Sequence, residues 1–247
     1  MNQISLKAGT VLTAALLLVS APVLAEEVSA ELQAVRDTVS EHFAEIGAED
    51  IFESPIDGWY TIRKGAIIAY ITADGRYLLQ GDLIDLENNA NLSEESRNDA
   101  RVIMMSAVPN EELIVFTPEN VEHTVSIFTD IDCTFCRRLH AQIDQYMAQG
   151  IEIRYFLYPR NGPTSPSWAK AESVWCADDR NEALTLAKLD QEYPTRTCDS
   201  SIVSNHYAIG QDVGLRGTPA IVLDDGTLFS GYLPPDQLKQ AIVDAGR

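Results

Sequence analysis

Apolar residues recur at intervals of three and four near the start of the chain. The positions are Leu32, Val35, Val39, Phe43 and Ile46. This spacing places them on one face of an α-helix. Ser29 precedes the run and can cap the helix, and Gly47 follows it as a stop signal. The pattern therefore predicts a short amphipathic helix that packs one face on a sheet.

Four short runs rich in β-branched, aromatic and aliphatic residues follow and predict the strands of that sheet. They cover residues 59–63, 66–72, 77–80 and 83–86. Asp74-Gly75 separates the second run from the third, and this dipeptide between two apolar runs is a strong hairpin signal. We therefore expect residues 26–87 to form a small α+β domain.

The composition changes to Asn, Ser, Glu and Arg between residues 88 and 109. The stretch Ser93-Glu94-Glu95-Ser96 can open a helix, and Pro109 can close it. We interpret residues 88–109 as a polar linker helix. The alternative is a surface helix that belongs to one of the neighbouring domains.

Strands and helices are mixed in a different order over residues 110–247. Apolar runs predict strands at 113–116, 124–128, 151–157, 220–223 and 228–231, with an Asp225-Gly226 turn between the last two. Helical patterns cover 133–149, much of 167–213, and 235–245. This order predicts an α/β domain with a mixed sheet and a helical insertion.

Composition and charge exclude some classes of protein. The chain has 247 residues, of which 45% are hydrophobic, so it can bury a substantial core. It carries 37 Asp and Glu against 18 Lys and Arg, a formal net charge of −19. A nucleic-acid-binding protein needs clustered Lys and Arg to neutralise phosphates. We therefore expect a soluble protein without a nucleic-acid partner.

The first 25 residues predict a secretory signal peptide that is removed. Lys7 precedes an uncharged run over residues 8–24, and Val23-Leu24-Ala25 ends it at the spacing of a cleavage site. A membrane anchor is the competing interpretation, but the run includes Gly9 and Pro22 and falls short of about 20 strongly apolar residues. Export would place all four cysteines in an oxidising compartment, where disulfides persist.

Cys133-Thr134-Phe135-Cys136 stands directly after a predicted strand and at the start of a predicted helix. Free N–H groups and the positive end of the helix dipole stabilise a thiolate at that position. We expect Cys133 to be the more exposed, nucleophilic cysteine. Cys136, one helical turn later, can attack the mixed disulfide that Cys133 forms and release the substrate. Arg137 and Arg138 add positive charge nearby.

Other roles for the cysteines are disfavoured. A zinc site would have to use Cys176 and Cys198, which lack the close pairing usual in structural zinc modules. A c-type haem needs His directly after the second cysteine of the motif, where Arg137 stands. A purely structural disulfide between Cys133 and Cys136 would close a loop too short to constrain the unfolded chain much. We expect neither a metal nor another cofactor.

Two further features add to the motif. Pro219, in Gly217-Thr218-Pro219-Ala220, stands at the threshold of a predicted strand, where a cis peptide bond is plausible. The four cysteines allow three disulfide connectivities, of which we favour a pair between Cys176 and Cys198. That pair would staple the helical insertion with a contribution on the order of 3 kcal/mol.

These motifs, with the signal peptide and the N-terminal unit, resemble the periplasmic disulfide isomerases of the DsbC type and their DsbG relatives. The stretches that carry the resemblance are 71–76 (ITADGR), 80–81 (QG), 128–136 (FTDIDCTFC), 139–140 (LH), 175–177 (WCA), 206–210 (HYAIG), 217–220 (GTPA) and 231–232 (GY). They extend over nearly the whole chain that would remain after cleavage.

The resemblance implies a V-shaped homodimer. Its N-terminal domain dimerises, a linker helix carries a thioredoxin-fold domain on each arm, and an apolar cleft binds misfolded proteins. Cys133 and Cys136 would be catalytic, Thr218 and Pro219 would shape the substrate site, and the second disulfide of the family would join Cys176 and Cys198. A membrane reductase of the DsbD type would keep the catalytic pair reduced.

Two departures from related proteins stand out. The dipeptide between the cysteines is Thr134-Phe135, where DsbC proteins typically carry Gly-Tyr and DsbG proteins Pro-Tyr, and we expect both residues to contact substrate. Ordinary thioredoxins place a buried carboxylate six residues before the first cysteine, and here Ile127 stands there. Proton transfer to or from Cys136 must then use another route.

The function that we predict is disulfide isomerisation and reduction in the periplasm, with chaperone activity on misfolded secreted proteins. Two alternatives stay open. A DsbG-like enzyme would reduce single oxidised cysteines, for which sulfenic acid is the reversible species. A protein that acts mainly as a holding chaperone would bind apolar segments without thiol chemistry.

Overall fold

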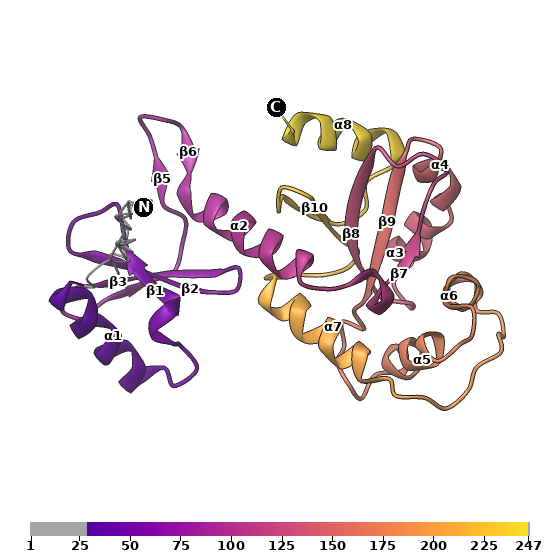
Figure 1. The fold of residues 1–247 in the computed structure, drawn as a ribbon, viewed down its shortest axis with the longest axis horizontal. Helices are drawn as coiled ribbons and strands as arrows, with labels where there is room; N and C mark the ends of the chain where they lie inside the picture. Colours follow the sequence, from indigo (N-terminus) through magenta and orange to yellow (C-terminus); the bar gives the residue numbers. More distant parts are fainter. Residues whose placement is uncertain (1–28, 247) are drawn as a thin grey trace, which may run out of the picture.

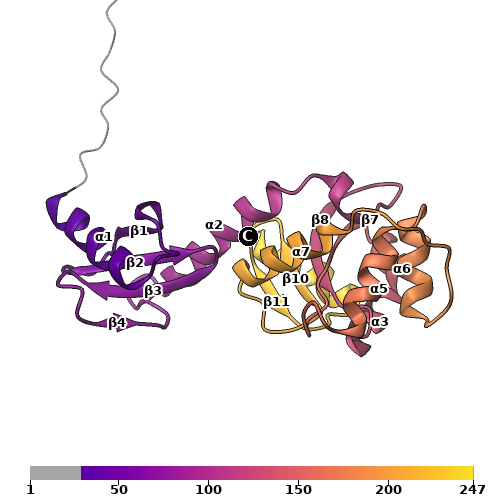
Figure 2. The same cartoon turned by 90° about the horizontal axis from the view of Figure 1, so that it is seen from below.

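The computed structural model describes residues 29–246, so the expected signal peptide lies outside the described residues. Two lobes are joined by a single helix, α2 (Figure 1, Figure 2). Across residues 29–246, none of the helices combines the length and the apolar character that a bilayer crossing requires. The fold is an α+β N-terminal domain, a linker helix and a C-terminal α/β domain with a mixed sheet and a helical insertion.

The N-terminal lobe contains one helix and a four-stranded antiparallel sheet in the order β1-β2-β3-β4. Its elements are α1 (Ala30–His42), the 3-10 turn η1 (Ala48–Asp50), β1 (Ile51–Glu53), β2 (Trp59–Lys64), β3 (Ile67–Thr72) and β4 (Leu78–Leu79). The predicted helix and its cap are confirmed, because the Ser29 hydroxyl accepts a hydrogen bond from the Leu32 N–H at 3.1 Å. The helix ends four residues earlier than its apolar pattern, and β1 was not predicted.

The core of this lobe lies between α1 and the sheet, as the helical spacing predicted. The buried side chains are Leu32, Val35, Val39, Ile51, Tyr60, Ile62, Ala69 and Ile71. The Asp74-Gly75 turn joins β3 to β4, and Gly75 adopts a φ of 68°. A Cβ at Gly75 would lie 2.4 Å from Cγ2 of Thr38 on α1, so the turn requires glycine for both its backbone and its close packing.

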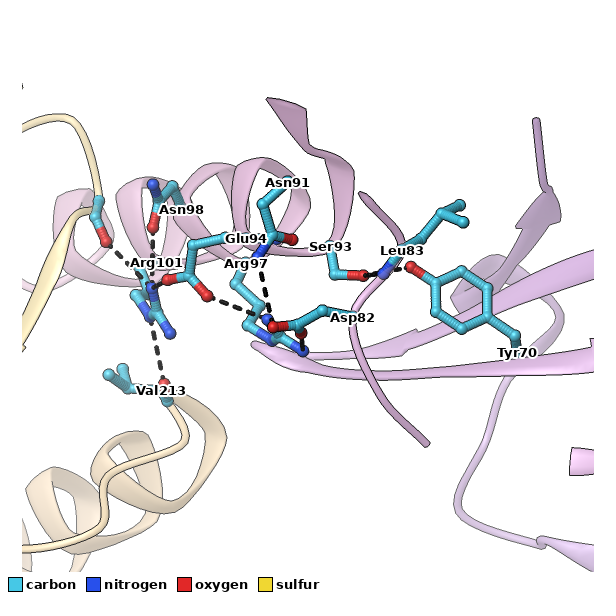
Figure 3. A network of polar contacts seen from close by, with 11 residues as sticks. Tyr70, Asp82, Leu83, Asn91, Ser93, Glu94, Arg97, Asn98, Arg101 and Val213 are labelled. Carbon is cyan, nitrogen blue, oxygen red and sulfur yellow. Dashed lines mark hydrogen bonds and ion pairs between the residues drawn. The ribbon is translucent and has the colours of Figure 1, made fainter. Parts of the chain in front are cut away.

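The linker differs from its prediction at its beginning. The fourth predicted strand is only the short β5 (Ile84–Asp85), which pairs with β6 (Ala90–Asn91) in a separate two-stranded sheet. Helix α2 spans Leu92–Ser106, and its N-cap is Asn91, whose side chain accepts from the Glu94 N–H at 2.9 Å. Ser93 was predicted to open the helix. It is buried in the first turn of α2, where its hydroxyl accepts a hydrogen bond from the Leu83 N–H at 2.8 Å and contacts the Tyr70 hydroxyl (Figure 3).

Helix α2 is attached to the C-terminal lobe by a buried arginine. Arg101 is 4% exposed and its guanidinium donates to the carbonyl oxygens of Val213 and Gly226, both at 3.3 Å. The same group is paired with Glu94 at 2.7 Å (Figure 3). A Cβ at Gly226 would lie 2.1 Å from the backbone oxygen of Asn98, so the Asp225-Gly226 turn packs directly on the helix. The C-terminal half of the linker helix is thus docked on the second lobe.

The C-terminal lobe is built on a five-stranded mixed sheet in the order β11-β10-β8-β9-β7, in which only β8 and β9 are parallel. Its elements are η2 (Asn110–Glu112), β7 (Ile114–Phe116), β8 (His123–Thr129), α3 (Thr134–His140), α4 (Ile143–Met147), β9 (Ile151–Leu157), α5 (Pro166–Trp175), α6 (Arg180–Lys188), α7 (Ser201–Asp212), β10 (Ala220–Leu223), β11 (Leu228–Ser230) and α8 (Pro235–Ala245). The single helix predicted over 133–149 is wrong, because the chain bends at Ala141 and Gln142.

Both faces of this sheet are covered, which explains the continuous apolar runs of its central strands. Ile127 of β8 and Tyr155 of β9 pack on one face among residues of α3 to α6 and α8. Phe128 and Phe156 point to the other face, where Met104 and Met105 of α2 pack beside them. The segment predicted to be a polar linker therefore completes an apolar core.

Candidate active site

The CxxC motif lies where β8 leads into α3. Cys133 is the N-cap of α3 with extended backbone, and Cys136 lies in its first turn. Both cysteines are free of disulfides. Cys133 was expected to be the more exposed cysteine, but both are buried, with 2% of Cys133 and 1% of Cys136 exposed. What distinguishes the two sulfurs is their polar surroundings.

Polar partners from three segments stabilise the thiolate of Cys133. The pKa of Cys133 lies well below the usual value of a cysteine, first because the Cys136 side chain hydrogen-bonds to its sulfur. Burial opposes this effect, while the side chains of Thr218 and Arg160 and the backbone of Cys136 add to it. A thiolate is the reactive form in disulfide exchange. Cys133 therefore has the environment of a nucleophile.

Cys136 has the opposite character. Burial is the largest cause that raises the pKa of Cys136, and the hydrogen bond to Cys133 raises it further. The positive charge of Lys188 acts in the other direction and lowers it. Cys136 therefore stays protonated while Cys133 is ionised.

The peptide bond between Thr218 and Pro219 is cis, as the sequence made plausible. The carbonyl oxygen of Thr218 lies 3.2 Å from the Cys133 sulfur and accepts its hydrogen bond when Cys133 is protonated. The Thr218 hydroxyl accepts from Nη1 of Arg160 at 3.1 Å. The structure thus brings Cys133, Cys136, Thr218 and Pro219 together, with Pro219 buried and Thr218 partly exposed.

Thr134 and Phe135 lie on the outer side of the motif. Both are exposed, and 54% of Phe135 is accessible. A large apolar side chain exposed beside a nucleophile is available to contact an extended substrate.

Sequence reasoning did not identify Arg160 and did not assign Asp130 a role beyond its charge. Asp130 is 2% exposed and accepts from the backbone N–H groups of Asp132 at 2.9 Å and Arg160 at 3.1 Å. Its carboxylate also lies 3.9 Å from Nε of Arg160. Asp130 therefore holds the loop before Cys133 and the segment that presents Arg160. Arg160 follows the end of β9 by three residues, and no sequence pattern marks it.

The sequence suggested that Arg137 and Arg138, which follow Cys136, add positive charge near the cysteines. Arg137 pairs with Asp190 at 2.5 and 2.7 Å and with Asp132 at 3.2 Å. Arg138 lies over the ring of Tyr232, 4.8 Å from its centroid. Both guanidinium groups thus have other partners, and the arginine beside Cys133 is Arg160.

Two titratable groups behind the motif are almost fully buried. His140 contacts the Tyr155 hydroxyl at 3.1 Å and the Thr185 hydroxyl at 2.9 Å, and burial lowers the pKa of His140 to about 3. Lys188, at the end of α6, is 3% exposed and donates to the Thr129 hydroxyl at 2.8 Å. No sequence signal identified Lys188.

Cys176 and Cys198 form a disulfide with Cα atoms 5.5 Å apart. Cys176 caps the end of α5, and Cys198 lies just before α7. The bond therefore ties the irregular segment between α6 and α7 to α5.

Comparison with known proteins finds a related domain for each of the two lobes. Residues 26–94 match the N-terminal domain of disulfide bond isomerase proteins, and residues 109–246 match the thioredoxin-like domain. The chain is 38% identical to the thiol:disulfide interchange protein DsbC of Dickeya dadantii, over 79% of this chain and 80% of the relative. It is 35% identical to DsbC of Escherichia coli K12, over 79% and 81%. A disulfide interchange protein from Neisseria gonorrhoeae of known structure is 29% identical, with a TM-score of 0.50 over 56% of this chain and 97% of that one.

Proposed function

The chain belongs to the DsbC family of thiol:disulfide interchange proteins, and we propose that Cys133 and Cys136 carry its chemistry. The protein is a thiol:disulfide interchange enzyme with disulfide isomerase and reductase function. The observation that supports these two residues is the contact of the Cys133 sulfur with Thr218 at 3.2 Å, in surroundings that favour its thiolate.

The reaction begins when the Cys133 thiolate attacks one sulfur of an incorrect disulfide. A bond forms between Cys133 and that sulfur, and the other substrate sulfur leaves as a thiolate. In isomerisation, a substrate thiolate later attacks the mixed disulfide, forms the new substrate disulfide and returns Cys133 as a thiolate. In reduction, Cys136 loses its proton and attacks Cys133 instead. The cysteine pair is then oxidised, and the substrate leaves with both sulfurs reduced.

The difference between the two cysteines favours isomerisation. Because burial, the largest cause, raises the pKa of Cys136, little of it is ionised while the substrate is bound to Cys133. The mixed disulfide therefore persists long enough for the substrate to rearrange. A substrate that does not rearrange can still be released when Cys136 attacks the mixed disulfide.

Four residues around the sulfur would form the substrate site. Thr134 and Phe135 offer an exposed surface beside Cys133, and Thr218, joined to Pro219 by a cis peptide bond, contacts the Cys133 sulfur. An extended substrate segment would lie between these two pairs, with its reactive sulfur at Cys133.

Refolding of a scrambled protein with several disulfides tests this assignment. Cys133→Ala should abolish recovery of the native disulfides. Cys136→Ala should retain part of the isomerisation and accumulate mixed disulfides. Recovery by Cys133→Ala at the wild-type rate would reject the thiol mechanism. If that variant still suppresses aggregation, binding of misfolded chains is independent of the thiol chemistry, as a holding chaperone requires.

We also propose the three-part organisation and the dimer. Residues 26–87 would dimerise, 88–109 would link, and 110–247 would catalyse. The match to the isomerase N-terminal domain supports a homodimer, as does an apolar edge at β4, where Leu78 and Leu79 are about half exposed. Sedimentation that finds one chain per particle at micromolar concentration would contradict the dimer.

The cellular setting follows from the same family. We propose that residues 1–25 direct export and are removed, that the enzyme works in the periplasm, and that a membrane reductase of the DsbD type returns Cys133 and Cys136 to thiols. A reducing partner is needed because an oxidised pair has no nucleophile. The N-terminal residue of the exported protein and the redox state of Cys133 in cells with and without the reductase test these points.

A further inference from the structure

A buried cation lies behind the cysteine pair. Lys188 is 3% exposed, and the one hydrogen-bond partner of its Nζ within residues 29–246 is the Thr129 hydroxyl, at 2.8 Å. None of the ion pairs in that part of the chain includes Lys188. Removing an ammonium group from water costs several kcal/mol, and buried charges are normally paired with an opposite charge. Lys188 therefore has a positive charge without an ion-pair partner among the described residues.

Two contacts align Lys188 with Cys136. Arg137, the residue after Cys136, pairs with Asp190, two residues after Lys188, at 2.5 and 2.7 Å. One turn further along α3, His140 contacts the hydroxyl of Thr185 on α6 at 2.9 Å. Cys136 is next to the first contact on α3, and Lys188 lies between the two contacts along α6. The end of α6 is thereby held at the level of the buried thiol.

While Cys133 is bonded to substrate and carries no charge, the groups around Lys188 leave the thiolate of Cys136 as its counter-charge. The titratable and charged groups that face it are Cys133, Cys136, Arg137 and His140 from α3, Asp130 from the loop after β8, and Tyr155 from β9. His140 is neutral, because burial lowers its pKa to about 3, and burial raises the pKa of Tyr155 far above its usual value. Asp130 is already paired with Arg160. Of the two cysteines, Cys136 has the stronger effect on Lys188.

We propose that the ammonium group of Lys188 stabilises the thiolate of Cys136 when Cys136 resolves the mixed disulfide. Lys188 is a positioning charge in this role, acting on the buried sulfur across the α3–α6 interface. The proposal rests on the proposed function of Cys133 and Cys136. It assigns a group that favours ionisation of Cys136, which the apolar Ile127, fully buried on the same strand as Thr129, cannot do.

Lys188 assists the step in which Cys136 displaces the substrate from Cys133. The Cys136 thiol releases its proton to solvent, and its thiolate forms beside the Lys188 ammonium. The thiolate attacks Cys133 Sγ, the Cys133–Cys136 bond forms, and the bond between Cys133 and the substrate breaks. The substrate sulfur leaves as a thiolate and takes up a proton from solvent. Lys188 keeps its proton throughout, so its contribution is present only while it is charged.

Stopped-flow reaction of the reduced full-length protein with one equivalent of dithionitrobenzoate per subunit separates the two steps. Attack by Cys133 releases the first thionitrobenzoate, and attack by Cys136 on the resulting mixed disulfide releases the second. Lys188→Met removes the charge with little change in side-chain length. We expect the second phase to be about tenfold slower at pH 7, because loss of the positive charge raises the pKa of Cys136 and reduces its thiolate, an effect that greater nucleophilicity offsets in part. The first phase should change by less than about twofold.

The pH profile provides a readout that a loss of structure would not produce. Burial lowers the pKa of Lys188 to about 8. The advantage of the wild type over Lys188→Met should therefore be greatest below pH 8 and shrink as the pH rises through that value. Lys188→Arg, which retains the charge, should restore part of the second phase. The matched control is Lys239→Met, on α8 and paired with Glu122, which should leave both phases unchanged.

Stability distinguishes the charge effect from damage to the fold. Replacing an unpaired buried cation by an apolar side chain of similar volume should leave the urea midpoint of the reduced protein equal or higher. A slow second phase with a lower midpoint and no dependence on pH would overturn the proposal, as would a second phase within twofold of the wild type. A wild-type protein that releases only one equivalent of thionitrobenzoate would overturn the proposed function as well as this inference.

Discussion

The sulfur of Cys133 lies 3.2 Å from the carbonyl oxygen of Thr218, 85 positions further along the chain. The two residues meet because β8 and β10 are antiparallel neighbours, with Phe128 opposite Ala220. The loop that leaves β8 therefore lies against the segment that enters β10. The surroundings of the nucleophile are thus set by strand pairing as well as by the start of α3.

Arg160 should control the ionisation of Cys133. The pKa of Cys133 is lowered, so in a Cys136→Ser protein its alkylation rate should remain high well below pH 8.5 and fall only as the pH drops through the lowered pKa. Arg160→Met removes a positive charge and a hydrogen bond, so the midpoint should move up by about one pH unit. Iodoacetamide kinetics against pH measure it.

The control for this prediction is Arg196→Met, whose exposed side chain pairs with Asp178. It should leave the alkylation profile of Cys133 unchanged. A profile of Arg160→Met that coincides with that of the parent protein would mean that Arg160 does not contribute to the thiolate.

The disulfide between Cys176 and Cys198 should matter for stability and not for chemistry. Replacing both cysteines by serine removes a crosslink that restricts the unfolded chain. This should lower the free energy of unfolding by about 3 kcal/mol. The thermal midpoint and the urea midpoint should both fall. The rate of the first thionitrobenzoate release at Cys133 should stay within twofold, and a large loss of that rate would show that the staple also shapes the site.

Arg101 should hold the linker helix on the C-terminal lobe. Arg101→Met removes the hydrogen bonds to Val213 and Gly226 and should destabilise the protein by about 2 kcal/mol. Amide hydrogen exchange in α2 should rise, because the helix loses its polar attachment. Arg76→Met, at an exposed site in the N-terminal lobe, is the control. Unchanged exchange in α2 would show that the apolar contacts of Met104 and Met105 are sufficient for docking.

The exposed edge of β4 should be needed for dimerisation. Leu79→Asp places a charge on an edge strand whose Leu79 side chain is 50% exposed. Burial of an unpaired carboxylate in an interface is costly, so the dimer should dissociate. Sedimentation velocity measures this, with Ile56→Asp, at another exposed apolar position, as the control. A Leu79→Asp protein that remains dimeric would place the interface elsewhere.

Local patterns were sufficient for much of the fold. The spacing of Leu32, Val35 and Val39 predicted α1, and Ser29 is its cap. The Asp74-Gly75 dipeptide predicted the hairpin after β3. These features depend on a few consecutive residues, so a single sequence reveals them. The break between α3 and α4 at Ala141 had no such marker.

The linker shows where local patterns mislead. Residues 88–109 look polar in composition, yet Arg101 and Ser93 are buried in the structure. Their partners, Val213 and Tyr70, belong to the two lobes on either side of the helix. A polar residue is expected at the surface unless its hydrogen-bond partners in the interior are known. The partners of these two residues are distant in sequence, so local patterns do not reveal them.

The active site divides in the same way. The CxxC motif and the Thr-Pro pair could be identified from sequence, because each is a short run of residues with a recognisable chemistry. Sequence did not reveal that Cys133 is buried, that Asp130 anchors its loop, or that Arg160 and Lys188 provide the positive charges near the two sulfurs. Charge acts through space and depends on burial, and both are properties of the packed chain. The sequence alone was therefore enough to identify the reacting atoms, and only the tertiary structure decided which groups control their ionisation.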